Sequence, residues 1–246
     1  MCDRVVVARF IQVLGGWTLA PILALTACVS AEAAAEPVEQ GDQAVTADYD
    51  TYAAFATRHG MAPRSNRALV IGIRGRDLTG NVHSARVTRT YDDTLVVLTP
   101  DQRMFRLAVS THPWETVGKA GVPDVDRDGR ADVGMIRPGK YLAVRRESSR
   151  DIAGARTYQV VTAAGSDRLP GYRNTDQDDV YSAAERAASE ARGDVLTAVL
   201  FHQGGDGAPA AVGCQVLDAD GIRRLASEVG ARFDYLLVDA NEVEVP

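Results

Sequence analysis

The chain has 246 residues, with 27 Lys and Arg against 33 Asp and Glu, and a formal net charge of −6. Because the chain is acidic and has no tract rich in Lys or Arg, it is a poor match for nucleic acid or an anionic lipid surface, and we expect no nucleic-acid partner. Only one of its three cysteines lies beyond residue 28, so the rest of the chain cannot form an intramolecular disulfide and depends on a packed core.

The N-terminus has the three parts of a secretory signal. Two arginines give a positive start, an apolar run covers residues 10–25, and residues 25–28, Leu-Thr-Ala-Cys, match the bacterial lipobox. The apolar run is too short, and too interrupted by Gly and Pro, to span a hydrocarbon layer of about 30 Å. We therefore predict a lipoprotein signal peptide over residues 1–27, cut before Cys28, which then carries the lipid.

The next segment reads as a spacer between the lipid and the domain. Residues 28–45 hold the lipidated cysteine and a stretch rich in Ala and Glu, which is typical of a flexible tether. Val29 follows the cysteine, and the lack of an Asp there favours the outer membrane over the inner one. We expect a protein of the cell envelope, lipid-anchored at the periplasmic face of the outer membrane. Residues 46–246 suit a single globular domain.

The hydrophobic pattern predicts the elements of this domain in chain order. Helical spacing of apolar residues predicts helices over residues 46–59, 180–192 and 218–229. Short apolar runs predict strands over residues 67–73, 94–98, 104–109, 141–145, 158–162, 196–201 and 233–238. Many strands with few helices indicate a mixed, β-rich α+β domain in which the helices pack on a sheet.

A histidine, a glycine-rich turn and a Gly-Cys pair follow a strongly apolar strand. His202 comes first, Gly204 and Gly205 lie in the turn, and Gly213 and Cys214 follow it. Thiol catalysis needs a thiolate, whereas a free Cys has a pKa of about 8.5, so a nearby imidazole is needed to take the proton. Backbone N–H groups beside the thiol would stabilise an oxyanion. The pattern predicts a thiol active site with Cys214 as nucleophile and His202 as base.

This arrangement, His-x-Gly-Gly followed by Gly-Cys-Gln, resembles a variant of the L,D-transpeptidase catalytic-domain family of bacterial cell-wall enzymes. Arg74-Gly75, Tyr91-Asp92-Asp93 and Pro138-Gly139 also occur in the order seen in that family, so the similarity covers residues 67–238. The resemblance implies a β-sandwich-like catalytic fold with a few packed helices.

The resemblance also implies a cysteine acyltransferase or peptidase that acts on the stem peptides of peptidoglycan. Cys214 would attack a carbonyl between an L-centre and a D-amino acid, and the acyl-enzyme would pass to an amine in a transpeptidase or to water in a carboxypeptidase. The N–H groups of Gly213 and Cys214 would form the oxyanion hole. Catalysis would need no cofactor. Substrate binding is expected at Gly204, Gly205, Gln215 and Arg74.

One residue departs from the family pattern. The common motif is Ser-His-Gly-Cys, whose His is the usual base, and Val212 stands at that position here. Valine cannot accept a proton, so the role falls to His202, or to His83 or His112 elsewhere in the domain. The departure also favours a second hypothesis, a catalytically degenerate lipoprotein that binds cell wall or a partner protein. An active Cys214 would react fast with alkylating reagents at pH 7, whereas a core cysteine would be inert until the protein unfolds.

An acidic segment forms a second motif. Residues 124–132 read Asp-x-Asp-x-Asp-Gly-x-x-Asp, and alternating carboxylates on a turn place their oxygens around one hard cation. The spacing resembles calcium loops of dockerin-like and integrin-type repeats. A solvated acidic turn is the alternative reading. We predict a structural Ca²⁺ site with ligands from Asp124, Asp126, Asp128 and Asp132.

Overall fold

The structure is a computed structural model that describes residues 45–246, apart from residues 120 and 206. The predicted signal peptide, the predicted lipidation site at Cys28 and the predicted tether as far as residue 44 lie outside the described residues. Within the described part, no helix has the length and apolar character needed to cross a membrane.

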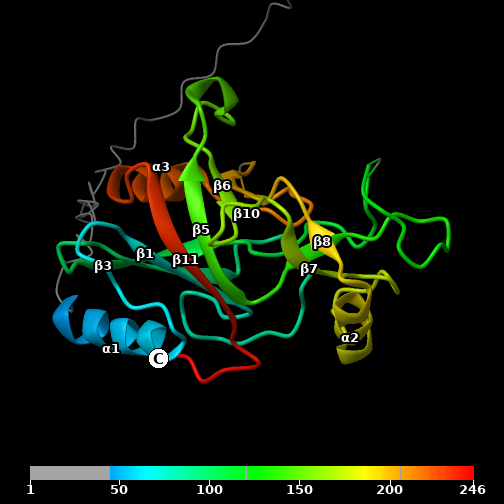
Figure 1. Ribbon diagram of the computed structural model, residues 1–246, viewed down its shortest axis with the longest axis horizontal. Helices are drawn as coiled ribbons and strands as arrows, with labels where there is room; N and C mark the ends of the chain where they lie inside the picture. Colours follow the sequence, from blue (N-terminus) through cyan, green and yellow to red (C-terminus); the bar gives the residue numbers. More distant parts are fainter. Residues whose placement is uncertain (1–44, 120, 206) are drawn as a thin grey trace, which may run out of the picture. The chain divides into compact units, whose positions relative to one another are not determined.

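The main sheet of the described residues has eight strands in the order β10-β9-β6-β5-β11-β1-β2-β3 (Figure 1). Their bounds are β1 Leu69–Arg74, β2 Asp93–Leu98, β3 Met104–Val109, β5 Gly139–Arg145, β6 Tyr158–Val161, β9 Leu200–Gln203, β10 Gln215–Leu217 and β11 Arg232–Asp239. β1 pairs in parallel with β11, and β9 with β10, whereas the other neighbours are antiparallel. Ser110, directly after β3, bridges to Val216 of β10, so the first and last strands meet and the sheet nearly closes.

A second, three-stranded sheet lies beside the main one, and the two sheets are connected by the loops between their strands. It consists of β4 (Gly134–Ile136), β7 (Leu169–Arg173) and β8 (Val195–Leu196). A short 3-10 helix, Ser148–Arg150, follows β5. Between β8 and β9 the chain turns at Ala198, whose φ of 55° is in the left-handed region. That turn carries the chain from the small sheet to the main one.

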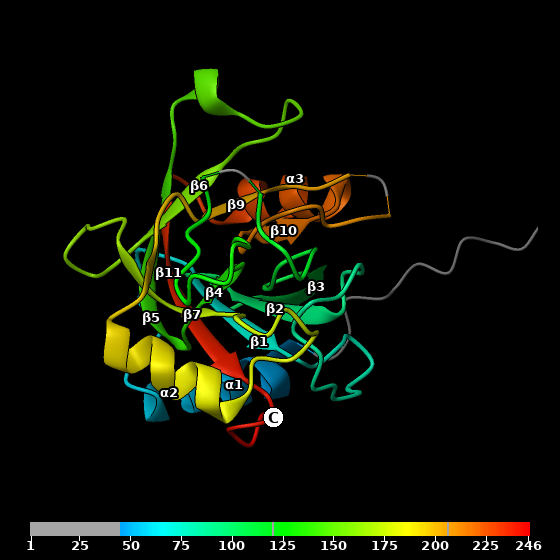
Figure 2. The ribbon, with the colours of Figure 1, turned by 90° about the vertical axis from the view of Figure 1, so that its right-hand side faces the viewer.

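Two of the helices cover opposite faces of the main sheet (Figure 2). On one face, α1 (Val45–Arg58) buries Phe55 in a cluster with Ile71 of β1. On the other, α3 (Ala219–Glu228) buries Leu225 in the larger cluster that contains Val70 of β1. Because both faces are covered, β1 is buried along its whole length.

The third helix, α2 (Ala183–Arg192), packs against β7 of the small sheet. It begins with a capping box, in which Ser182 accepts from the Glu185 main-chain N–H and Glu185 accepts from the Ser182 N–H at 2.8 Å. Gly193, at φ 69°, ends it in the left-handed conformation that glycine adopts without a steric cost.

The prediction of a mixed, β-rich α+β domain with few helices is confirmed. The three predicted helices correspond to α1, α2 and α3, with α2 starting three residues later than expected because Ser182 caps it. The strand predicted over residues 196–201 is wrong as a single element, since the turn at Ala198 splits it into the end of β8 and the start of β9. β4, β7 and β10 were not predicted.

Candidate active site

The loop that follows β9 and leads into β10 positions the thiol. Gly213 has a φ of 97°, and a Cβ placed there would lie 2.2 Å from the Gly134 carbonyl oxygen, so only glycine fits next to Cys214. The Cys214 side chain is half-buried, and its Sγ lies 3.9 Å from the Ala198 carbonyl oxygen. Two neighbouring loops therefore hold the thiol in place.

His202 lies on β9, beside the strand that starts after the thiol. The two strands pair in parallel with His202 opposite Val216. The His202 Nδ1 lies 2.7 Å from the Gln203 carbonyl oxygen, and because a carbonyl only accepts, Nδ1 carries the proton. Nε2 of the neutral ring is then free to accept a proton, which is the tautomer that a general base needs.

Cys214 and His202 line the same pocket. Its volume is about 410 Å³, and its other lining residues are Gly121, Val122, Pro123, Arg173, Leu196, Thr197, Ala198, Ala211 and Val212. No hydrogen bond between Cys214 and His202 is present among the described contacts. The structure thus brings the two predicted catalytic residues to one cavity, with Val212 as part of its wall.

Burial moves the pKa values of both groups. It raises the pKa of the Cys214 thiol, against a smaller opposing effect of a main-chain hydrogen bond at Leu200. It lowers the pKa of His202, and the hydrogen bond to Gln203 opposes this in part. At neutral pH the pair is therefore a neutral thiol and a neutral imidazole, in contrast to a preformed thiolate–imidazolium pair.

Gly204 and Gly205 shape the loop between the two residues. The Tyr91 hydroxyl donates to the Gly205 carbonyl at 2.9 Å, and a Cβ on Gly204 would lie 2.4 Å from that hydroxyl oxygen. Gly205 also pairs with Ala208 through two main-chain hydrogen bonds. Neither glycine lines the pocket, so both residues determine the conformation of the loop and do not form part of the pocket wall.

The other two predicted substrate-binding residues are buried supports of the fold. Gln215 is fully buried and accepts a 2.6 Å hydrogen bond from the Tyr235 hydroxyl. Arg74 is also fully buried, and it donates to the Thr111 main-chain oxygen at 2.8 Å and to the Ile136 oxygen at 3.0 Å. Neither side chain lines the Cys214 pocket.

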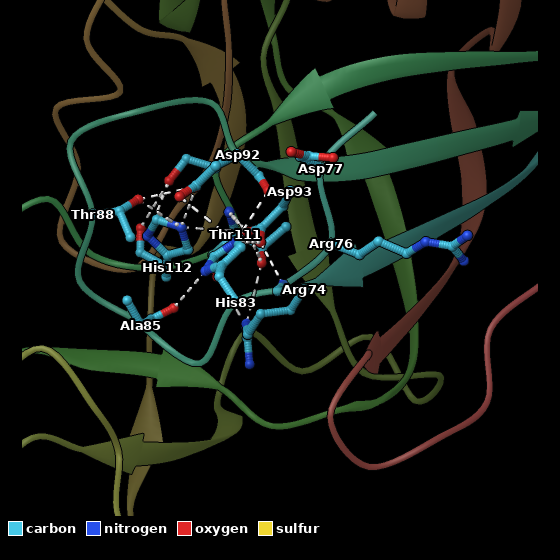
Figure 3. A network of polar contacts seen from close by, with 12 residues as sticks. Arg74, Arg76, Asp77, His83, Ala85, Thr88, Asp92, Asp93, Thr111 and His112 are labelled. Atoms are coloured by element: carbon cyan, nitrogen blue, oxygen red, sulfur yellow. Dashed lines mark hydrogen bonds and ion pairs between the residues drawn. The ribbon is translucent and has the colours of Figure 1, made fainter. Parts of the chain in front are cut away.

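The two histidines considered as alternative bases meet in a separate polar network (Figure 3). The His112 Nε2 lies 2.9 Å from the Asp92 Oδ1, and the His83 Nε2 lies 3.7 Å from the Asp93 Oδ1. Thr111 donates to the Asp93 Oδ2 from its N–H at 2.8 Å and from its hydroxyl. Neither histidine lines the Cys214 pocket, which leaves His202 as the imidazole at the thiol.

Electrostatics in this network favour a charged His83. Its Nδ1 lies 3.1 Å from the Ala85 carbonyl oxygen and its Nε2 lies 3.1 Å from the Asp92 carbonyl oxygen, so both nitrogens face acceptors. The Asp93 carboxylate raises the pKa of His83 to about 9, with burial opposing and Asp92 adding to the effect. Although burial opposes it, His112 and His83 hold the pKa of Asp93 below its ordinary value.

The same three side chains form a group that could hold a metal ion. Ligand atoms of His83, Asp92 and Asp93 lie within 4.8 Å of one another. A cation there would replace the proton on the His83 Nε2. The sequence analysis singled out the Tyr91-Asp92-Asp93 motif and named His83 as a possible base, but it did not predict a metal site, because His83 and the Asp92-Asp93 pair meet only through the fold of the loop before β2.

The predicted calcium loop lies in the connection from β3 to β4, on the right of Figure 1. The carboxylates of Asp124, Asp126 and Asp128 are exposed and approach within 4.8 Å of one another, as a metal site requires. Asp132, the fourth predicted ligand, is not part of that group; it is fully buried, and its Oδ2 accepts a 2.6 Å hydrogen bond from the Val125 N–H. Burial raises the pKa of Asp132, and the Asp126 and Asp124 carboxylates add to this.

Several pocket residues were not singled out from the sequence. Val122 comes from the segment before the acidic loop, Arg173 from the end of β7, and Ala198 from the turn between the sheets. They are distant along the chain and carry no motif, so only tertiary structure assembles them.

In comparisons with family models, curated proteins and solved structures, no match to this chain was found.

Proposed function

We propose that this protein is a cysteine enzyme of the bacterial cell envelope, an L,D-transpeptidase or L,D-carboxypeptidase that acts on peptidoglycan stem peptides. The observation that carries the proposal is the shared pocket of Cys214 and His202, in which the imidazole has the tautomer of a base. The leader motif supports anchoring through a lipid on Cys28.

The pair of neutral groups supports a mechanism in which the thiol is deprotonated as it attacks. The His202 Nε2 takes the Cys214 proton while Sγ bonds to the carbonyl carbon of the L-centre. The tetrahedral intermediate collapses with loss of the D-amino acid, whose amine leaves with the proton from His202. An acceptor amine, or water, then gives a proton to the His202 Nε2 as it attacks the thioester carbonyl, and the C–S bond breaks as His202 returns that proton to Sγ, which frees the Cys214 thiol.

The pocket has features that suit this substrate class. Arg173 is its one lining residue with a fixed charge among those described, and a guanidinium favours a substrate that carries a carboxylate, as the terminal D-amino acid does. The N–H groups of Gly213 and Cys214 lie next to the thiol in sequence, where an oxyanion would form.

The fold is part of the proposal. We assign the β-rich domain with its nearly closed sheet to the L,D-transpeptidase catalytic fold, supported by the position of the motif at the edge of that sheet. His202 lies one residue before the end of β9 and Cys214 directly precedes β10, and these two strands are neighbours. The pairing explains why a thiol and an imidazole separated by a loop belong to one site.

We also assign a structural Ca²⁺ to the acidic loop. The alternation of Asp124, Asp126 and Asp128, with Gly129 at φ 91° in the turn, supplies oxygen ligands on one side of the loop. Asp132 adds a buried carboxylate at the base of the same loop. Hard oxygen ligands of this number favour calcium over a soft transition metal.

A second function is favoured by two observations, the presence of Val212 in place of the usual histidine and the raised pKa of the thiol. Both suit a degenerate relative that binds cell wall or a partner protein without turnover. This alternative predicts that removal of the thiol leaves the chemistry of the cell wall unchanged.

The decisive experiment compares the full-length protein in mild detergent with Cys214→Ala on purified sacculi, both in calcium and in a calcium chelator. Muropeptides are separated and identified by mass spectrometry. Loss of the terminal D-amino acid, or new cross-links, should appear only with the intact thiol. His202→Gln should lower the rate by about 100-fold or more, the contribution of a general base. Identical muropeptide profiles for the protein and Cys214→Ala would leave the binding module as the function.

A further inference from the structure

The acidic loop and the thiol pocket share one continuous stretch of chain. Gly121, Val122 and Pro123 line the pocket, and Asp124, the first carboxylate of the loop, follows directly. A ligand that fixes the conformation of the acidic loop therefore also restrains the adjoining segment 121–123 of the pocket wall.

A buried oxygen at the base of the loop indicates a ligand, independently of the exposed carboxylates. Asp132 is fully buried, yet its Oδ1 has no hydrogen-bond partner in the described structure. The Oδ2 of the same carboxylate accepts from the Val125 N–H inside the loop, so the group faces the loop. An unpaired buried carboxylate oxygen is costly. Asp132 lies outside the group of Asp124, Asp126 and Asp128, so a cation held by those three carboxylates would satisfy this oxygen by drawing the base of the loop toward it.

The backbone of Asp132 is tied to the pocket at two points. Its N–H donates to the Pro123 carbonyl oxygen at 2.8 Å, which holds the wall segment. Its carbonyl oxygen accepts from the Arg173 Nη1 at 3.1 Å, and Arg173 itself lines the pocket. One residue thus faces the acidic loop with its side chain and holds two parts of the pocket with its main chain.

The strand after the loop reaches the nucleophile. β4 starts at Gly134, two residues beyond Asp132, and the Gly134 carbonyl oxygen occupies the space where a Cβ on Gly213 would lie. Since Gly213 precedes Cys214, both ends of the acidic loop lead to the surroundings of the thiol within a few residues.

We propose that a calcium ion bound by Asp124, Asp126, Asp128 and Asp132 fixes the walls of the Cys214 pocket, so that calcium controls access to the thiol. The inference rests on the calcium site and the thiol pocket of the proposed function, and it adds a regulatory link between them. With calcium, the segment 121–123 and Arg173 close around the half-buried thiol. Without it, the carboxylates repel one another and the wall loosens.

The test measures thiol access and needs no enzymatic activity. Full-length protein is treated with a bulky maleimide in calcium, in magnesium or in a calcium chelator, and the alkylated fraction is read on tryptic peptide 193–223, in which Cys214 is the only cysteine. Calcium should slow alkylation by about fivefold or more, the lower range of ordinary coupling between sites. Magnesium should have little effect because it prefers a smaller octahedral site.

The matched variants separate the loop from general charge effects. Asp126→Asn removes an exposed ligand, and its alkylation rate should be as fast in calcium as the rate of the unchanged protein in chelator. Asp167→Asn removes the same charge from an exposed position outside the loop and should keep the calcium effect.

Calorimetric titration of the same samples with calcium distinguishes a failure of the calcium site from a failure of its coupling to the thiol. Calcium binding with an unchanged or faster alkylation rate would overturn the coupling while the calcium site stands, and absence of binding would overturn both. Neither result concerns the muropeptide assay, so a failure of the enzymatic proposal is recognised separately. A calcium-dependent thiol without muropeptide products would place the same link in a binding protein.

Discussion

Cys214 and His202 occupy one pocket, yet burial keeps both of them neutral at rest. A thiolate is the reactive form of cysteine, so the resting thiol is a weak nucleophile. The expectation of fast alkylation at pH 7 therefore does not follow from this geometry. Activity would depend on proton transfer to His202 as the substrate is attacked.

The alkylation rate of the neutral Cys214 thiol should depend on pH in a way that can be measured. The pKa of Cys214 is raised, so iodoacetamide should react more slowly at pH 7 than with a free cysteine, and the rate should still be climbing above pH 9. His202→Gln should leave this profile unchanged, since no described hydrogen bond joins the imidazole to the thiol. A rate that levels off below pH 7, and loses that plateau in His202→Gln, would instead reveal a preformed ion pair.

Cys214 and Gln215 are adjacent in the motif, but their side chains lie in different surroundings because β10 begins between them. Cys214 lines the pocket, whereas Gln215, the next residue, lies in the interior and bonds to Tyr235. Gln215 is the first residue of β10, whereas Cys214 lies in the loop before that strand, so adjacency in sequence does not give the two side chains the same surroundings. The motif alone identified a site around the cysteine, and it could not assign a face to each of its members.

At the scale of elements, the turn at Ala198 decides the shape of the pocket. A run of apolar residues predicts one strand over 196–201, but β8 and β9 belong to different sheets and Ala198 joins them at φ 55°. Leu196, Thr197 and Ala198 all line the pocket. A left-handed residue other than glycine costs free energy, and such positions occur frequently at functional sites.

Replacing Ala198 tests this turn. Ala198→Gly should raise the free energy of unfolding by about 1 kcal/mol, because glycine adopts the left-handed region without a clash. Ala163→Gly, at an exposed turn residue with negative φ, should lower it by roughly 0.5–1 kcal/mol through the added freedom of the unfolded chain. Denaturant unfolding of both variants gives the comparison, and changes of the same sign would show that Ala198 is not strained.

The missed strands have two causes. β4 and β10 have three residues each, too few for a period-two pattern to be recognised. Pro170 and Gly171 also interrupt β7, and both residues are depleted in strands. These segments become strands because their partners supply the hydrogen bonds, and a single sequence does not contain that information.

At the scale of the whole molecule, buried charges connect distant segments. Arg86 bonds to Asp239 at 2.6 Å, and both side chains are almost fully buried. The network of His83, Asp92 and Asp93 joins the start of β2 to the preceding loop. Removal of one partner from such a pair is costly because the other charge stays buried.

The raised pKa of His83 predicts how stability depends on pH in metal-free protein. A folded-state pKa of about 9, above the usual 6.5, means that protonation stabilises the fold fully below pH 6.5, and this contribution is lost as pH rises through 9. At about 1.4 kcal/mol per pKa unit the loss is at most about 3.5 kcal/mol, and partial exposure of the ring reduces it.

Urea unfolding at several pH values, with a chelator present, measures the contribution of His83 protonation to the free energy of unfolding. His83→Gln should be destabilised at pH 6 and should show a flatter curve between pH 6.5 and 9 than the unchanged protein. His59→Gln is the control, because the described contact of His59 is with the Phe55 ring and not with a carboxylate. Parallel curves for all three proteins would contradict a protonated His83.

The sequence by itself determined the β-rich class, the three helices and the identity of the thiol and of the acidic loop, because these depend on local periodicity and on residue types at short spacing. Only the tertiary structure decided that His202 shares a pocket with Cys214, whereas His83 and His112 belong to another network. It also decided that the acidic loop borders the thiol pocket. Such neighbourhoods arise from the pairing of strands distant along the chain, and the pattern of any single segment does not specify its partner.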